Sequence, residues 1–295
     1  MPLPAPPLTP DETLDDAPAT PAPDALRDAA AVSGAASPAA PRPGDSYVQS
    51  FARGLAVIRS FSAEAPAQTL TQVAQRAGLT RAGARRILLT LEHLGYVESQ
   101  GRLFRLTPRI LDLGFAYLSS LPLWNLAEPV MESLVADVRE SCSAAVLDGS
   151  EIVYVLRVPT QKIMSINLGI GSRLPAYCTS MGRMMLAGLS PEEQRQRLQA
   201  LPRHRHTART VTDEAALLDR IAEAGRQGWC LVDQELEEGL ISLAAPIRDR
   251  GGRVIAALNI SGQPGRTPPV VMTGQLLPRL LEAARQISEL LQRKA

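Results

Sequence analysis

Apolar positions in the first half of the chain predict three short helices. They recur at helical spacing in three successive sets: Phe51, Leu55 and Ile58; Leu70, Val73, Ala74 and Ala77; and Ala84, Ile87, Leu88, Leu91 and Leu94. Gly78 suits the left-handed backbone that ends a helix, and Gly95 ends the third stripe in the same way. Thr80 can cap the third helix. The tight turn between the second and third helices has the spacing of a helix-turn-helix.

A wing and a connecting helix are expected next. Residues 96–97 and 103–106 read as two short strands, and the polar segment 99–102 between them contains a glycine that suits a turn. Pro108 is expected to start a further helix that is apolar on more than one face. A helix of this kind is typical of a linker that packs against a partner.

From about residue 123 onward, helices and strands are mixed. Helices are expected over 128–140, 181–189, 213–227 and 276–291, and strands over 144–147, 152–158, 163–168, 240–247 and 254–260. Asp148-Gly149 and the segment 249–252 are turn signals between pairs of strands, and each predicts a hairpin. The fold class expected here is therefore α+β, an antiparallel sheet flanked by helices.

The first 46 residues differ in composition from everything that follows. They hold eleven of the 24 prolines, interleaved with alanines, and almost no aromatic or β-branched side chains. Such a segment buries too little surface to offset its ordering entropy, so we predict a disordered Pro/Ala-rich acidic tail over 1–46. An inert extension is favoured over an arm that binds a partner. The winged helix-turn-helix would then occupy 47–107, the linker helix 108–122 and the α+β domain 123–295.

Charge is also segregated. Residues 1–46 hold two arginines against seven acids, a net of −5, whereas residues 47–109 hold nine arginines against three glutamates, a net of +6. A basic module behind an acidic tail suggests an anionic partner such as nucleic acid, although a charge run is more often a solvated face.

The start of the third predicted helix carries the strongest sign of DNA binding. The apolar stripe leaves five residues exposed there: Arg81, Ala82, Gly83, Arg85 and Arg86. Arginine can grip guanine O6 and N7 together or clamp a phosphate, and the small residues allow close approach. Arg102 in the predicted wing can reach a phosphate or the minor groove. Together with the turn spacing, these residues favour a DNA-reading element over a solvated basic face.

These residues belong to longer runs that resemble the IclR family of bacterial regulators, aligned from about Val48 to Leu290. The runs are QSFARGLAVIRSFS, LTQVAQRAGLTRAGARRILLTLEHLGYV and GRLFRLTPRILDLGFAYLSS. More narrowly, the chain resembles the PcaR, PcaU and PobR subgroup, which controls aromatic-acid catabolism through the β-ketoadipate pathway. That likeness is carried by CSAAVLDGSEIVYVLRV, GSRLPAYCTSMGRMMLAGL, VDQELEEGL and ALNIS.

The resemblance implies a winged helix-turn-helix joined by a linker helix to a GAF-like effector-binding domain, in a homodimer or dimer of dimers. It implies a ligand-responsive, sequence-specific regulator of aromatic-compound catabolism that binds double-stranded operator DNA and a small aromatic or β-keto acid. RNA polymerase is a further candidate partner. Ala82 and Gly83 stand where the family often has Ser-Thr, which removes two hydroxyl contacts with phosphate and shifts binding onto the arginines. The Pro/Ala-rich tail matches no family motif.

A loop-to-helix junction at residues 179–182 is the first candidate for the effector site. Backbone N–H groups and the positive end of the helix dipole converge at such a junction and would suit a carboxylate. Local sequence alone favours an ordinary N-cap made by Thr179 or Ser180, and Tyr177 and Cys178 fit a core position equally well.

The resemblance implies that this loop and three later motifs line the pocket. On matching positions the candidates are Leu174, Tyr177, Cys178, Thr179, Ser180, Met181, Asp233, Glu235, Ser242, Ala244, Asn259 and Ser261. Hydroxyls and an amide would fix the acid and a ring hydroxyl, while Leu174, Met181 and Leu258 would contact the ring. Glu237 and Glu238 are better explained as a solvated acidic loop.

The sequence gives little support for metal binding or catalysis. Cys142, Cys178 and Cys230 form no close pair and read as reduced thiols, and His204 and His206 have arginines rather than ligands beside them. The run GIGSRL lacks the third glycine and the Lys-Ser or Lys-Thr ending of a phosphate loop, and no G-x-S-x-G elbow occurs. We therefore expect no metal, no cofactor and no enzyme activity.

Two other function classes stay open: a small-molecule-binding enzyme with a non-DNA-binding helical domain, and a scaffold whose basic domain binds acidic proteins. No apolar run approaches the roughly 18–20 residues of a membrane span. The start of the chain also lacks the order of a secretory signal. These two features predict a cytoplasmic protein.

Overall fold

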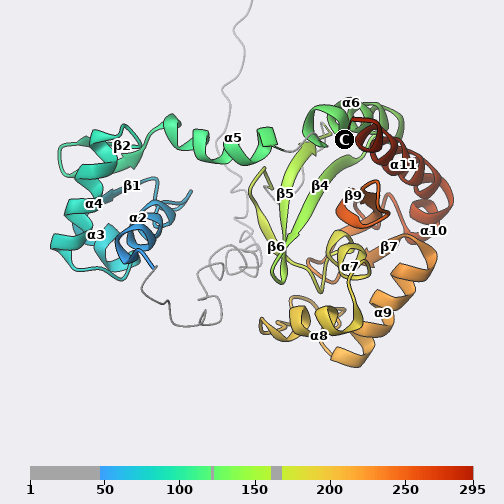
Figure 1. Cartoon of the computed structure of the whole chain (residues 1–295). Coiled ribbons are helices and arrows are strands. Elements are labelled where there is room, and N and C mark those ends of the chain that lie inside the picture. The colour runs from blue at the N-terminus through green and yellow to red at the C-terminus, as the bar shows by residue number, and fades with distance from the viewer. Residues whose placement is uncertain (1–46, 121–122, 161–167, 295) are drawn as a thin grey trace, which may run out of the picture. The chain divides into compact units, whose positions relative to one another are not determined.

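The computed structural model describes residues 47–120, 123–160 and 168–294 (Figure 1). The tail predicted over 1–46 lies outside the described residues. So do 121–122 at the end of the predicted linker helix, and all of the strand expected at 163–168 except its last residue.

The first part contains the predicted helices and wing. Its elements are α2 (Gln49–Arg59), β1 (Ala67–Thr69), α3 (Leu70–Arg76), α4 (Arg81–His93), β2 (Val97–Gln100) and β3 (Leu103–Leu106). Thr80 caps α4, since its Oγ1 accepts a hydrogen bond from the Gly83 N–H at 3.1 Å. Gly78 and Gly95 follow α3 and α4 with φ of +64° and +80°, a backbone region that favours glycine. The predicted winged helix-turn-helix is thus confirmed.

Strand β1 was not predicted from the sequence. It is three residues long, too short to show a period, and pairs antiparallel with β3 through Ala67↔Arg105 and Thr69↔Leu103. The three-stranded sheet has the order β1-β3-β2. The helices pack on a small core of Val57, Val73, Ala74, Ala84, Leu88, Leu91 and Val97.

The connecting segment starts at Pro108, as predicted, but its first turn is a 3-10 helix. This turn, η2 (Pro108–Ile110), is followed by α5 (Leu111–Ser120). The side chains of Leu111 and Phe115 on α5 are 69% and 68% exposed.

The second part is α+β, as predicted. Its elements are α6 (Leu123–Val138), β4 (Ser141–Asp148), β5 (Glu151–Val158), β6 (Arg173–Pro175), α7 (Ser180–Leu186), α8 (Pro191–Gln199), α9 (Glu214–Gln227), β7 (Cys230–Asp233), β8 (Ile241–Arg248), β9 (Val254–Gly262), α10 (Pro269–Val271), the π-helical turn η3 (Met272–Leu276) and α11 (Leu277–Lys294). The six strands form one antiparallel sheet of order β6-β5-β4-β9-β8-β7. Helices α6 and α11 cover one face, and α7, backed by α9, covers the other.

Elements β6, α8 and β7 were not predicted. The signal for α8 was present, because Ser190 and Glu193 form a capping box and Pro191 occupies the first helical position. The β4–β5 hairpin also turns one residue later than its signal suggested. Asp148 pairs with Glu151, so the turn consists of Gly149 and Ser150.

Strand alternation divides the apolar and polar residues of β8 and β9 between the two faces. Leu243 and Leu258 join the core under α6 and α11, whereas Ala244 joins the core under α7. Because side chains two residues apart share a face, Ser242 and Asn259 also lie on the α7 side. No helix in the described part of the chain is long and apolar enough to cross a membrane.

Candidate functional site

Four arginines lie exposed on the winged helix-turn-helix. Arg81, Arg85 and Arg86 are exposed at the start of α4, whose buried stripe is Ala84, Leu88 and Leu91, and Arg102 is exposed at the β2–β3 turn. The guanidinium groups of these four residues make no hydrogen bond or ion pair with another residue of the described ranges. Ala82 is exposed and Gly83 half-buried beside them. The face therefore offers guanidinium groups, with small residues between them, to an anionic partner.

A cavity lies between the start of α7 and the sheet face of β8 and β9. The empty space within it is about 490 Å³ when the solvent in its open mouth is included. It is lined by Tyr154, Arg157, Leu168, Leu174, Cys178, Thr179, Ser180, Met181, Val232, Leu236, Leu240, Ser242, Asn259 and Ser261.

Ser180, Ser242, Asn259 and Ser261 form a hydrogen-bonded cluster in the cavity wall. Ser180 Oγ lies 2.8 Å from Ser242 Oγ, and Asn259 Nδ2 donates to both Ser242 Oγ and Ser261 Oγ at 3.0 Å. Asn259 is held in turn by the Ser143 N–H, which donates to its Oδ1 at 3.1 Å. Since a hydroxyl can rotate between donating and accepting, this cluster can reorganise around an oxygen of a ligand.

Arg157 brings a positive charge to the same wall, and a bulge in β5 puts it there. Ala144 pairs with Leu156 and Ala145 with Tyr154, so Val155 is an extra residue between them. Arg157 therefore comes to the cavity side together with Tyr154, although alternation would place residues three apart on opposite faces. Its Nη1 donates to Ser143 Oγ at 3.4 Å.

Two acidic groups of the cavity wall, the Tyr154 phenol and the Cys178 thiol, stay protonated at neutral pH. Burial raises the pKa of the Tyr154 phenol to about 12, with nearby Arg157 acting in the opposite direction. Burial also raises the pKa of the Cys178 thiol to about 12, so the thiolate that nucleophilic attack or metal binding requires is not formed. Within the described residues, no group of three or more His, Cys, Asp or Glu side chains is arranged to hold a metal ion.

The junction at residues 179–182 is an N-cap and a cavity wall at once. Thr179 Oγ1 accepts from the Gly182 N–H at 3.3 Å and donates to Pro175 O at 3.0 Å. Ser180 and Met181 line the cavity, and the first N–H groups of a helix have no acceptor within it. The cap and the ligand-binding role are therefore compatible.

Five candidates from the sequence do not line the cavity. Tyr177 Oη donates to His204 O at 2.6 Å, and its ring stacks on that of His206 with centroids 6.2 Å apart. Asp233 forms an ion pair with Arg209, and Ala244 is fully buried in the core. Leu258, expected to contact the ring of an effector, packs in the core on the opposite face of the sheet.

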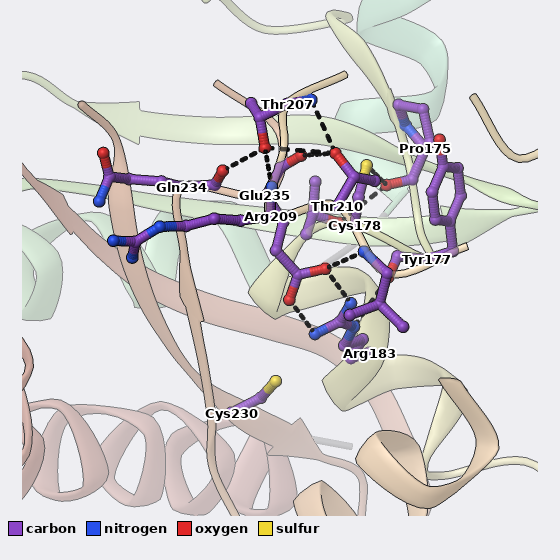
Figure 2. A network of polar contacts seen from close by, with 12 residues as sticks. Pro175, Tyr177, Cys178, Arg183, Thr207, Arg209, Thr210, Cys230, Gln234 and Glu235 are labelled. Carbon is purple, nitrogen blue, oxygen red and sulfur yellow. Dashed lines mark hydrogen bonds and ion pairs between the residues drawn. The ribbon is translucent and has the colours of Figure 1, made fainter. Parts of the chain in front are cut away.

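The fifth candidate, Glu235, binds other residues of the protein through its carboxylate (Figure 2). Its Oε1 and Oε2 accept from Arg183 Nη1 and Nη2 at 2.6 and 2.5 Å, and Oε2 also accepts from the Val211 N–H at 3.0 Å. Arg183 Nε donates to Tyr177 O at 2.7 Å. The side chains of Arg183 and Glu235 are 2% and 11% exposed.

Sequence reasoning did not select six of the lining residues: Tyr154, Arg157, Leu168, Val232, Leu236 and Leu240. Arg157 left one signal, because it is a charged residue inside an otherwise apolar predicted strand. The leucines and Val232 left none, since apolar residues of this kind are equally suited to the core.

Two protein families match the chain. Residues 50–101 match the IclR helix-turn-helix domain, and residues 115–289 match the bacterial transcriptional regulator IclR C-terminal family.

Individual proteins are similar over most of the chain. The Pca regulon regulatory protein of Pseudomonas putida is 43% identical, covering 82% of this chain and 83% of the relative. The p-hydroxybenzoate hydroxylase transcriptional activator of Acinetobacter baylyi is 35% identical, covering 83% and 93%.

Solved structures of other regulators are also similar to this chain over most of its length. A putative transcriptional regulator of Rhodococcus sp. RHA1 superposes with a TM-score of 0.76 at 49% identity, covering 83% of this chain and 98% of that one. An IclR homologue from Microbacterium hydrocarbonoxydans, complexed with 4-hydroxybenzoate, has a TM-score of 0.75 at 30% identity, covering 84% and 100%.

Proposed function

The chain belongs to the IclR family of bacterial transcriptional regulators, and we propose that it is a ligand-responsive, sequence-specific DNA-binding regulator of aromatic-compound catabolism. The support is the similarity to regulators named for the Pca regulon and for p-hydroxybenzoate hydroxylase, and to a homologue that holds 4-hydroxybenzoate. In this scheme residues 47–107 bind DNA, residues 108–122 form the linker helix between the two domains, and residues 123–295 bind the effector. Residues 1–46 are an extension.

The effector we propose is a small aromatic or β-keto acid bound in the α7 cavity. The observation that carries this is that Arg157 and the serine–asparagine cluster line the same cavity as apolar side chains such as Leu236 and Leu240. The guanidinium can bind a carboxylate, the hydroxyls and amide a ring hydroxyl, and the leucines a ring face. Tyr177, Asp233, Glu235 and Ala244 are left out of this contact set because none of them lines the cavity.

Operator DNA would be bound by the exposed arginines of α4 and the wing. Arg81, Arg85 and Arg86 would enter the major groove with the start of α4, close to the small Ala82 and Gly83, and Arg102 would contact a phosphate or the minor groove. The proposed site of action is the bacterial cytoplasm, with RNA polymerase as a further partner of the operator-bound protein. We propose regulation in place of catalysis, because both domain families that match the chain are families of transcriptional regulators.

Binding of the effector can change DNA affinity only through a difference between two states of an assembly. A homodimer or dimer of dimers supplies such states, and the exposed Leu111, Leu113 and Phe115 of α5 give it an apolar contact. Phe115→Glu should lower the mass seen in sedimentation equilibrium, whereas Val270→Glu, at a site 73% exposed outside α5, should not. Equal masses for both variants and wild type would remove α5 from the interface.

Calorimetric titration of the full chain with protocatechuate, 4-hydroxybenzoate and β-ketoadipate tests the effector class. At least one of the three should bind, and a null result with all three would reject the aromatic and β-keto acid proposal. Retention on heparin as salt rises tests the DNA-binding class, because counterion release requires a steep loss of affinity. Retention that does not depend on salt would favour a small-molecule-binding enzyme.

A further inference from the structure

We propose that the buried Arg183–Glu235 ion pair holds two walls of the effector cavity at a fixed distance and orientation. Effector affinity then depends on two side chains that do not line the cavity. This inference rests on the proposed effector function of the cavity. It replaces the sequence-based expectation that Glu235 contacts the effector itself.

Each partner of the pair lies within two residues of a side chain that lines the cavity. Arg183 lies in the first turn and a half of α7, whose Ser180 and Met181 form one wall. Glu235 immediately precedes Leu236, which with Val232 forms part of the other wall. The two-pronged contact of guanidinium and carboxylate fixes distance and orientation together, and a single hydrogen bond does not.

Glu235 also forms hydrogen bonds with a third segment, residues 207–211. The Val211 N–H donates to Glu235 Oε2, and Thr210 Oγ1 donates to the Glu235 backbone carbonyl at 2.6 Å. Thr210 Oγ1 also accepts from the Thr207 N–H at 2.8 Å. Figure 2 shows Thr210 beside Glu235, with the Arg183 guanidinium facing the Glu235 carboxylate. Three segments distant in sequence therefore meet at one carboxylate.

Burial separates this pair from an ordinary surface contact. A buried ion pair stabilises a fold little more than apolar side chains of the same volume, because desolvation offsets the attraction. Its geometric specificity is the property that apolar side chains lack. The neighbouring Asp233–Arg209 pair provides a built-in comparison: it starts two residues away on the same segment, yet Arg209 is 58% exposed. Exposed pairs of that kind contribute little.

The test compares Glu235→Gln with Asp233→Asn, two carboxylate-to-amide changes on one segment. In Glu235→Gln an NH₂ group faces N–H donors of Arg183 or Val211 and cannot accept from them. The two cavity walls then lose their fixed relative position. We expect the dissociation constant for 4-hydroxybenzoate to rise by about tenfold or more, in line with the cost of misplacing a binding group. Asp233→Asn should stay within about twofold of wild type. Retention on heparin should be equal for all three proteins.

A second arm needs no ligand and a milder variant. Thr210→Val removes the hydroxyl that bonds Glu235 O, whereas Thr210→Ser keeps it. Hydrogen exchange of the unliganded proteins should be faster over 177–187 and 232–240 in Glu235→Gln and Thr210→Val, with 67–106 unchanged. Thr210→Ser and Asp233→Asn should exchange like wild type. This arm decides the inference if Glu235→Gln folds poorly.

The outcomes separate the two proposals. If wild type binds none of the three acids, the proposed effector class fails while hydrogen exchange still decides the role of the pair. If Glu235→Gln only melts at a lower temperature, with the dissociation constant unchanged in the fully folded range, the pair is merely structural and the inference is overturned. Unchanged exchange in 177–187 for Glu235→Gln and Thr210→Val overturns it as well.

Discussion

Gly182 lies so close to Ala176 that a Cβ atom added to it would be 2.2 Å from the Ala176 carbonyl oxygen and 2.4 Å from its Cα. Thr179 Oγ1 would be only 2.6 Å away. Glycine at this position therefore lets α7 pack directly on the loop that precedes it. That loop carries Cys178 and Thr179 into the cavity wall, so the shape of the proposed effector site depends on a hydrogen atom at Gly182.

Gly182→Ala should therefore destabilise the protein, because the obstructing Ala176 atoms are backbone and cannot turn away. We expect the free energy of unfolding in urea to fall by about 1–3 kcal/mol or more, the usual cost of overpacking. Gly225→Ala in α9 is the matched control, since its Cβ would meet Ala187 Cβ at an ordinary 3.6 Å. The control should be neutral or gain up to about 1 kcal/mol from helix propensity. Equal stability of both variants would contradict the close approach.

Arg85→Ala should weaken operator binding while sparing the effector site. Arg85 is exposed at the start of α4, and one base contact is worth about 1–3 kcal/mol, or roughly a fivefold to 150-fold loss of affinity. Gel retardation with the operator fragment measures the loss, and calorimetry checks the effector. Arg195→Ala on α8 removes the same charge from an exposed site of the other part. If the two variants retard DNA equally, the assignment of Arg85 is wrong.

Arg157→Met should weaken binding of acids specifically. The change keeps an unbranched apolar stem in the cavity wall and removes the charge that would bind a carboxylate. A hydrogen bond to a charged group contributes about 1.5–3 kcal/mol, so affinity for 4-hydroxybenzoate should fall roughly 10- to 150-fold. The uncharged 4-hydroxybenzamide serves as the control ligand in calorimetry, because wild type and variant should bind it equally. A parallel loss for acid and amide would indicate a general distortion of the cavity.

His206 should make stability depend on pH. Burial lowers the pKa of its imidazole below the ordinary 6.5, and nearby His204 adds to the effect. The folded protein therefore binds fewer protons than the unfolded chain in this range. The stabilising contribution is present above the unfolded pKa and is lost as pH falls from about 6.5 through the lower folded value.

His206→Phe keeps a ring to stack on Tyr177 and removes the titration. Urea unfolding between about pH 8 and pH 5 should show a smaller decline for this variant than for wild type. Stability curves with the same slope below about pH 6.5 would show that His206 does not contribute.

Local interactions determined what the sequence could predict about the first part. Thr80 caps the helix that begins one residue later, and Gly78 and Gly95 end helices immediately before them. A helix places residues three and four apart on one face, so the buried stripe of α4 could be predicted from the sequence. The exposure of Arg81, Arg85 and Arg86 followed from the same spacing. In the second part, local turn signals predicted the hairpins β4–β5 and β8–β9, and with them the antiparallel α+β class.

Only the tertiary structure decided which side chains meet in the cavity. Ser180 and Ser242 are 62 residues apart, and Arg183 and Glu235 are 52 apart, so no local period relates them. Glu235 has the residue type of a ligand-binding group, and only its contact with Arg183 shows that its oxygens are already engaged. The position of Arg157 on the cavity face could not be predicted, because the extra Val155 reverses the alternation of β5 after Tyr154. Sheet register and long-range packing determine these contacts, and the spacing of neighbouring residues predicts neither of them.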